Sequence, residues 1–186
     1  MKKNLLAILL AFISCFGLNA QVLYEDFEGG PDLTCQSFNG AFNGAIANPD
    51  PDAVNNSATV GSTTNNAASS SCYNVGDLTS PMDLSEFNQF KIKVWSPIDT
   101  GRILFKVETI GGGAFAETFQ NVTVANEWVE YTFDLSPAAN ATTLNRITIV
   151  FNFEENDDNT FYFDDIRAVK ALRVFEDFET PSGVNW

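Results

Sequence analysis

The chain has 186 residues with 24 acidic and 10 basic side chains, which gives a formal net charge of −14. Because binding to phosphate groups needs clustered Lys and Arg, this balance argues against nucleic acid and anionic membranes as partners. Hydrophobic residues make up 45% of the chain, so it can bury a core, and the absence of His excludes His-dependent catalysis and His-ligated zinc.

The first twenty residues have the composition of a secretory signal peptide. Lys2 and Lys3 form a basic start, and an apolar stretch follows from Leu5 to Phe16. We therefore expect residues 1–20 to be removed and the mature protein to be secreted or displayed on the cell surface, with no membrane insertion after signal removal. The alternative is a lipoprotein anchored through Cys15, although apolar residues rather than a polar tether follow that cysteine.

A short phrase occurs twice in the chain. Residues 23–28 (LYEDFE) are restated at 174–179 (VFEDFE). Self-similarity over such a distance is typical of repeated modules. We expect one complete module at residues 21–170 and the opening strand of a second, truncated module at 171–186. Further modules in the same polypeptide are therefore expected partners.

Cysteine usage predicts a disulfide. Once Cys15 has left with the signal, Cys35 and Cys72 remain, and two cysteines in an oxidising compartment usually pair. A Cys35–Cys72 bridge would fasten the polar region at residues 39–71, which is built mainly from Asn, Ser, Thr, Ala and Gly. The alternative is two buried thiols. By composition this region is expected to be a solvated surface connection with one modest strand near 57–61.

From Asp83 onward, apolar and polar residues alternate with a period of two. Turn signals rich in Gly, Pro and Asn separate the alternating segments, and no segment carries a helical stripe longer than a turn or two. This pattern predicts an all-β sandwich. The predicted strands cover residues 90–95, 102–108, 129–135, 147–154 and 160–169.

Four segments, taken in order, resemble a jelly-roll carbohydrate-binding module. They are EDFE at 25–28, FKIKVWSP at 90–97, EWVEYTF at 127–133 and FYFDDI at 161–166. The likeness covers about residues 22–170 and is to the family 4, 9 and 22 group, which is galactose-binding-domain-like and occurs beside polysaccharidases in secreted multi-modular proteins of Bacteroidetes type. It implies an all-β, two-sheet antiparallel jelly-roll sandwich.

The resemblance also implies a function. Such a module would be non-catalytic and would target a larger protein to a polysaccharide, such as a glucan or xylan-like polymer. The same architecture serves as a structural or adhesive tandem module of cell-surface proteins without a glycan ligand, and that alternative stays open. Two carboxylates would suffice for a glycosidase, but no acid and base in a cleft can be identified, so no catalytic residue is expected.

A structural calcium between the first and last strands is a further implication of the resemblance. Asp26 and Glu28 stand two residues apart, so on a strand they would face the same way, while Phe27 would point to the core. Asp164 would join them if the first and last strands lie side by side. Calcium prefers several oxygen ligands; the alternative is a row of solvated edge acids. The expected ligands are Asp26, Glu28 and Asp164, with Asp165 and Glu25 as substitutes if the register shifts.

Sugar binding needs aromatic faces for C–H surfaces and planar polar groups for hydroxyls. Trp95 is the first candidate, because it falls on the same side of its strand as Lys91 and Lys93. Trp128 is instead expected in the core, and Tyr73 is a weaker candidate. The charged candidates can also be interpreted as a solvated sheet face. The expected ligand-binding residues are Trp95, Lys93, Lys106, Glu108, Glu130, Asn152 and Tyr162.

Overall fold

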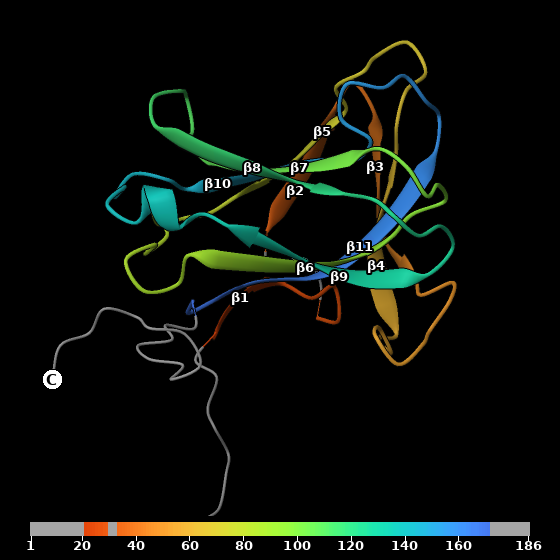
Figure 1. Cartoon of the computed structure of the whole chain (residues 1–186), viewed down its shortest axis with the longest axis horizontal. Helices are drawn as coiled ribbons and strands as arrows, with labels where there is room; N and C mark the ends of the chain where they lie inside the picture. The colour runs from red at the N-terminus through yellow and green to blue at the C-terminus, as the bar shows by residue number, and fades with distance from the viewer. Residues whose placement is uncertain (1–20, 30–32, 172–186) are drawn as a thin grey trace, which may run out of the picture.

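The computed structural model describes residues 21–29 and 33–171, which form two antiparallel β-sheets packed face to face (Figure 1). The six-stranded sheet has the order β3-β4-β11-β6-β9, with β1 paired to β11, and the five-stranded sheet has the order β2-β5-β10-β7-β8. The expected two-sheet antiparallel sandwich is confirmed. The strands are β1 (Gln21–Glu25), β2 (Thr34–Phe38), β3 (Ala41–Ala47), β4 (Thr59–Thr64), β5 (Tyr73–Asp77), β6 (Gln89–Trp95), β7 (Arg102–Glu108), β8 (Phe115–Asn121), β9 (Trp128–Asp134), β10 (Arg146–Val150) and β11 (Thr160–Val169).

The ends of the chain fall largely outside this description. The predicted signal peptide at 1–20 lies outside the described residues, as does the repeated phrase at 174–179. A single 3₁₀ turn, η1 (Ser136–Ala138), is the only helical element in the described part of the chain. None of its helices is long and apolar enough to cross a membrane.

Strands β6, β7, β9 and β11 form where the alternation predicted them. The alternation overextended β10, which ends at Val150. Asn152 and Glu154 have positive φ angles of 53° and 71°, which turn the chain away from the sheet. Three strands outside the prediction, β2, β5 and β8, complete the five-stranded sheet.

The polar region contributes two strands to the six-stranded sheet. The modest strand expected near 57–61 is confirmed as β4, which lies inside the sheet between β3 and β11. The expectation that the rest of the region is a solvated connection is wrong, because β3 pairs with β4. A Cβ at Gly61 of β4 would come within 2.5 Å of the Phe27 ring and 3.0 Å of the Phe163 ring. Glycine at this position lets both rings pack against the strand. Small residues here therefore make room for aromatic neighbours contributed by distant segments.

The core lies between the two sheets and is rich in Phe. The Phe105 ring of β7 packs against Phe90 and Phe133 of the opposite sheet, with ring centroids 5.1 and 4.9 Å apart. Phe151 stacks on Phe161 at 5.2 Å. All five rings are fully buried, so the inner faces of both sheets supply the main apolar stabilisation.

The first and last strands lie side by side, as expected. β1 and β11 pair antiparallel, from Gln21 opposite Val169 to Glu25 opposite Ile166 (Figure 1). A bulge interrupts β11 at Asp165, which has a φ of 51°. The pairing therefore brings the end of β1 close to the middle of β11.

The predicted disulfide is wrong, because Cys35 and Cys72 are both free thiols. Cys35 of β2 lies opposite Gly76 of β5, and Cys72 stands four residues before Gly76. The two cysteines are thus about 13 Å apart along the strand direction, beyond the Cα separation that a disulfide can bridge. Burial, with a contribution from the charge of Glu25, raises the pKa of Cys35 to about 12.

We expect thiol labelling of denatured residues 21–186 to modify both cysteines without reductant. The thiols are too far apart to pair unless the β2–β5 ladder opens, so the oxidised and reduced proteins should have the same mass. Alkylation followed by intact-mass measurement tests this. A mass lower by two hydrogen atoms, with both cysteines unmodified, would contradict it.

Candidate functional site

The structure divides the expected sugar-binding residues between two opposite faces. Trp95, Lys93 and Glu130 project from the six-stranded sheet, and Tyr162 joins them on β11. The strand that carries Lys106 and Glu108 belongs to the five-stranded sheet, and Asn152 follows β10 of that sheet. Because the core separates the two sheets, a single ligand cannot contact all these residues.

The charged sugar-binding candidates on the six-stranded sheet, Lys93 and Glu130, both form ion pairs. Lys93 pairs with Asp165 at 2.5 Å and Lys91 with Glu130 at 2.5 Å, while Arg167 lies between the two acids. Burial alone would raise the pKa of Glu130, but the bonds from Lys91 and Arg167 outweigh it and hold this pKa below its usual value. The charged side chains of this face are therefore committed to one another in a network of ion pairs.

Trp95 lies in a small aromatic cluster at one end of the same face. Its ring is tilted against that of Tyr162 at 5.2 Å, and its Nε1 donates to Asp50 Oδ2 at 3.2 Å. Trp128 lies opposite Trp95 on β9, where its Nε1 donates to the carbonyl oxygen of Asp50 at 2.9 Å. Trp128 is buried as expected, but on the Trp95 side of the sheet, where residue 50 of the 48–58 loop contacts it.

Exposed rings that the sequence analysis missed lie on β8 of the five-stranded sheet. Phe115 is 61% exposed and Phe119 36% exposed, and both lie on the outer side of that strand. Phe119 packs against Phe153 at 5.4 Å. The alternating segment FAETFQN at 115–121 could have predicted this strand. It was not recognised because it follows the three glycines at 111–113, which indicate a turn, and because most of its residues are polar.

Each of these two rings has a basic side chain over it, and each of these basic side chains forms an ion pair with an acid. Lys106 Nζ lies 4.9 Å from the centre of the Phe115 ring, and the Arg102 guanidinium 5.0 Å from that of Phe119. Lys106 also pairs with Glu108 at 2.8 Å, and Arg102 pairs with Glu154. Burial opposes ionisation of Glu108, yet hydrogen bonds from Lys106 and Thr148 keep its pKa below the usual value.

Asn152, which was expected among the sugar-binding residues, does not face outward. It is almost fully buried, and its Nδ2 donates to Asp157 Oδ2.

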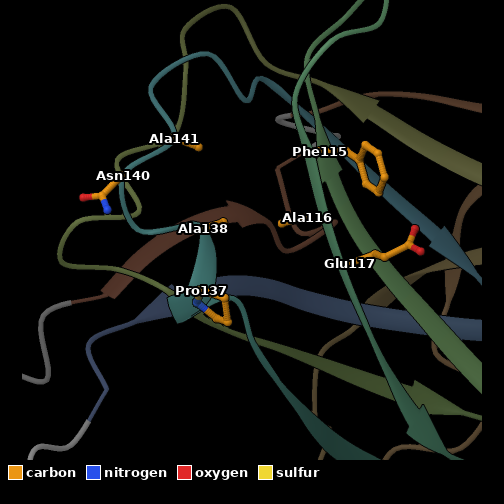
Figure 2. Close-up of a pocket in the computed structure, with 7 residues that line it drawn as sticks. All are labelled: Phe115, Ala116, Glu117, Pro137, Ala138, Asn140 and Ala141. Atoms are coloured by element: carbon orange, nitrogen blue, oxygen red, sulfur yellow. The ribbon is translucent and has the colours of Figure 1, made fainter.

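A shallow hollow lies between β8 and the loop after η1 (Figure 2). Its lining combines apolar residues, among them Ala116, Pro137 and Ala138, with the polar side chains of Glu117 and Asn140.

The repeated phrase ends β1 and shapes the turn that follows. Glu25 is fully buried; its Oε1 accepts the N–H of Phe27 at 2.8 Å and its Oε2 accepts that of Leu33 at 3.0 Å. Asp26 and Glu28 lie in the turn after the strand, so the expected strand spacing of these two acids is wrong. The Phe27 ring is buried as expected.

Asp164 is the most deeply buried of the three first-choice calcium ligands, Asp26, Glu28 and Asp164. It has no exposed surface, and its Oδ2 lacks a hydrogen-bond partner. Burial raises the pKa of Asp164 to about 6, although the side chains of Ser57 and Asn55 partly offset this. The Nδ2 of Asn55, which is fully buried as well, also lacks a partner. Two buried polar atoms thus remain unsatisfied where the 48–58 loop meets β11.

The other acids lie at different positions. Glu28 Oε1 accepts the N–H groups of Ala58 and Thr59 at 2.7 and 3.1 Å, which places Glu28 at the end of the same loop. Asp165 is instead committed to its ion pairs with Lys93 and Arg167. Within residues 21–29 and 33–171, no three acidic or cysteine side chains form a group suited to a metal. A cation at Asp164 would therefore need amide, hydroxyl or carbonyl oxygens beside it.

Comparison with known proteins reveals similarity at the level of the fold. A scan against family models and a search of curated proteins give no match. The family 11 carbohydrate-binding module from Clostridium thermocellum, solved with a β-1,3-1,4-mixed-linked tetrasaccharide, is 14% identical with a TM-score of 0.56, covering 83% of this chain and 98% of that one. The K1 cleaved adhesin domain of Lys-gingipain from Porphyromonas gingivalis W83 is 13% identical with a TM-score of 0.56, covering 82% and 99%.

A larger protein contains a similar unit. An exo-β-agarase is 14% identical with a TM-score of 0.65 over 84% of this chain, which spans only 26% of the agarase chain. These likenesses define the class: the chain has the β-sandwich fold of carbohydrate-binding modules, a fold shared with adhesin domains.

Proposed function

We propose that this chain is an extracellular, non-catalytic module that binds a polysaccharide of the glucan or xylan-like kind and directs a larger protein to it. The observation that carries the proposal is the pair of exposed rings, Phe115 and Phe119, on the outer face of the five-stranded sheet. Exposed rings can stack on the C–H faces of sugars, and the polar groups around them can bond hydroxyls. Lys106 and Glu108 remain proposed contacts on this face.

Three further considerations support the proposal. The predicted signal peptide at 1–20 is in keeping with an extracellular location, and the repeated phrase supports further modules as covalent partners. The similar clostridial module was solved with a mixed-linked tetrasaccharide, which makes such glucans the first ligands to test.

The double variant Phe115→Ala/Phe119→Ala should lose binding. Wild-type protein should be retarded in affinity gels containing mixed-linkage β-glucan or xylan. Each stacked ring is worth about 0.5–1.5 kcal/mol, so removing both should weaken binding by roughly tenfold or more. Retardation and isothermal titration with oligosaccharides measure the change.

Leu23→Ala is the matched control, because Leu23 is a similarly exposed apolar residue on β1 of the other sheet. It should bind as wild type does. Equal retardation of the wild type and the double variant, with both folded by circular dichroism, would remove the five-stranded face from the site. Trp95→Ala tests the second candidate surface, at Trp95 and Tyr162, in the same gels.

We also propose a structural calcium at Asp164. The residues fit a hard cation in one respect: an unpartnered buried carboxylate oxygen beside the side chains of Asn55 and Ser57 supplies the oxygen chemistry that calcium prefers. Glu28 at the end of the same loop is a further proposed ligand, while Asp26 and Asp165 are weaker ones. A bound calcium would compensate the buried charge and fasten the 48–58 loop to β11.

The likeness to gingipain adhesin domains favours a second candidate function, a structural or adhesive module without a glycan ligand. A glycan array with the isolated module separates the two functions. Reproducible binding to one class of polysaccharide supports the first, and silence across plant and algal polymers supports the second.

A further inference from the structure

Every basic side chain in the described part of the chain already forms an ion pair with an acid. Residues 21–29 and 33–171 contain seven Lys and Arg, and each has a carboxylate oxygen within 4.0 Å. The acids outnumber them, so this part of the chain carries net negative charge without an unpaired cation. An anionic polymer would meet repulsion and no free counter-charge. The pairs are Lys91–Glu130, Lys93–Asp165, Arg102–Glu154, Lys106–Glu108, Arg146–Asp77, Arg167–Glu130 and Lys170–Glu86.

One acid on the exposed face stands apart from these pairs. Glu117 is exposed on β8 between Phe115 and Phe119, and no hydrogen bond or ion pair is formed by its side chain among the described residues. Residues two apart on a strand share a face, so its carboxylate lies between the two rings. Figure 2 shows Phe115 and Glu117 projecting from the same side of β8, with Ala116 on the other. The strand thus presents an aromatic, acidic, aromatic row.

The length of this row favours a polysaccharide chain over a single sugar as the ligand. Phe115 and Phe119 are four residues apart, which is about 13 Å along a strand, longer than one pyranose ring. Lys106 lies over the Phe115 ring and Arg102 over the Phe119 ring, which helps to hold both rings in place. A ligand that contacts both rings must therefore extend along β8.

Resting on the proposed function, we propose that the ligand is an uncharged polysaccharide that lies along β8, and that Glu117 is a specificity-determining residue. The rings of Phe115 and Phe119 contact C–H faces of two separated sugar units. The Glu117 carboxylate accepts hydrogen bonds from hydroxyl groups of the unit between them. The same carboxylate repels uronate or sulfate groups at that position.

The first test is a panel of immobilised polysaccharides at low and high NaCl. We expect binding to an uncharged β-glucan or xylan that salt does not weaken, and no binding to pectate, alginate or carrageenan. Salt-sensitive binding to an anionic polymer would overturn this inference and leave the proposed function intact. Absence of binding to every polymer would overturn both.

The second test replaces Glu117. A hydrogen bond to a charged group is worth about 1.5–3 kcal/mol, so Glu117→Ala should weaken binding to the uncharged polymer roughly tenfold to a hundredfold. Glu117→Gln keeps an acceptor oxygen and should lose less. Glu117→Lys should lose the uncharged polymer and gain measurable, salt-sensitive binding to an anionic one.

Glu127→Ala and Glu127→Lys are matched controls, because Glu127 is another exposed acid, located in the turn before β9. Both should bind as wild type does, and all variants should melt as wild type does. If Glu117→Ala binds the uncharged polymer with unchanged affinity, Glu117 does not determine specificity. If Glu127→Lys gains anionic binding equal to that of Glu117→Lys, general charge rather than the β8 row is responsible.

Discussion

Saturating calcium should raise the midpoint of thermal unfolding of this module by roughly 5–10 °C. A ligand that binds only the folded state at a hundred times its dissociation constant adds about 2.7 kcal/mol, and each kcal/mol moves the midpoint of a domain of this size by about 2–4 °C. The physical reason lies in Asp164: its buried Oδ2 has no hydrogen-bond partner, and burial disfavours the charged form of its carboxylate. Differential scanning calorimetry with calcium and with chelator measures the shift.

Asp164→Asn should abolish this response. The amide keeps the shape of the carboxylate but removes its charge, so in chelator the variant should be at least as stable as wild type. Glu127→Gln is the control: it removes the charge of an exposed acid in the turn before β9, which is not a proposed ligand, and should keep the calcium response. An unchanged wild-type midpoint, or equal shifts in wild type and Asp164→Asn, would remove the site.

Glu25→Ala should lower the free energy of unfolding by roughly 2–5 kcal/mol. Removal of the side chain leaves the N–H groups of Phe27 and Leu33 without the oxygens that accept them, and each unsatisfied buried donor costs about 1–3 kcal/mol. Against a typical domain stability of about 5–15 kcal/mol, this is a large loss. Urea denaturation followed by tryptophan fluorescence measures it.

Asp26→Ala is the matched control within the same phrase. Asp26 Oδ1 accepts one exposed N–H, that of Glu28 at 3.0 Å, so its loss should cost less than about 1 kcal/mol. Comparable destabilisation by both substitutions would contradict the assignment of Glu25 as the residue that holds the turn. Loss of all folded protein with Glu25→Ala, and not with Glu25→Gln, would agree with it.

The sequence anticipated the strands in which alternation is regular. β6 and β11 follow the predicted ranges closely, because buried apolar residues alternate with more exposed ones along β6 and on both sides of the bulge in β11. β3 and β8 were missed for the opposite reason: β3 is built from small residues and β8 is an edge strand with polar and aromatic residues on its exposed side. A strand of that kind is recognisable only from its partner.

The candidate site depended on tertiary structure in the same way. Lys93 and Lys106 have similar sequence settings, yet they lie on opposite faces of the sandwich because β6 and β7 belong to different sheets. Cys35 and Cys72 looked like a natural pair until the register of β2 against β5 separated them. Spacing along the chain carries no information about either distance.

By itself, the sequence determined the all-β architecture, because a period of two is a local property of a strand. The pairing of the first strand with the last followed only from the resemblance to jelly-roll modules until the structure placed β1 beside β11. Only the tertiary structure decided which acids matter. Glu25 is buried because the chain turns back over it, and Asp164 because the 48–58 loop meets β11 there. Burial of a carboxylate, and hence its pKa and its need for a partner, depends on residues that approach from elsewhere in the chain.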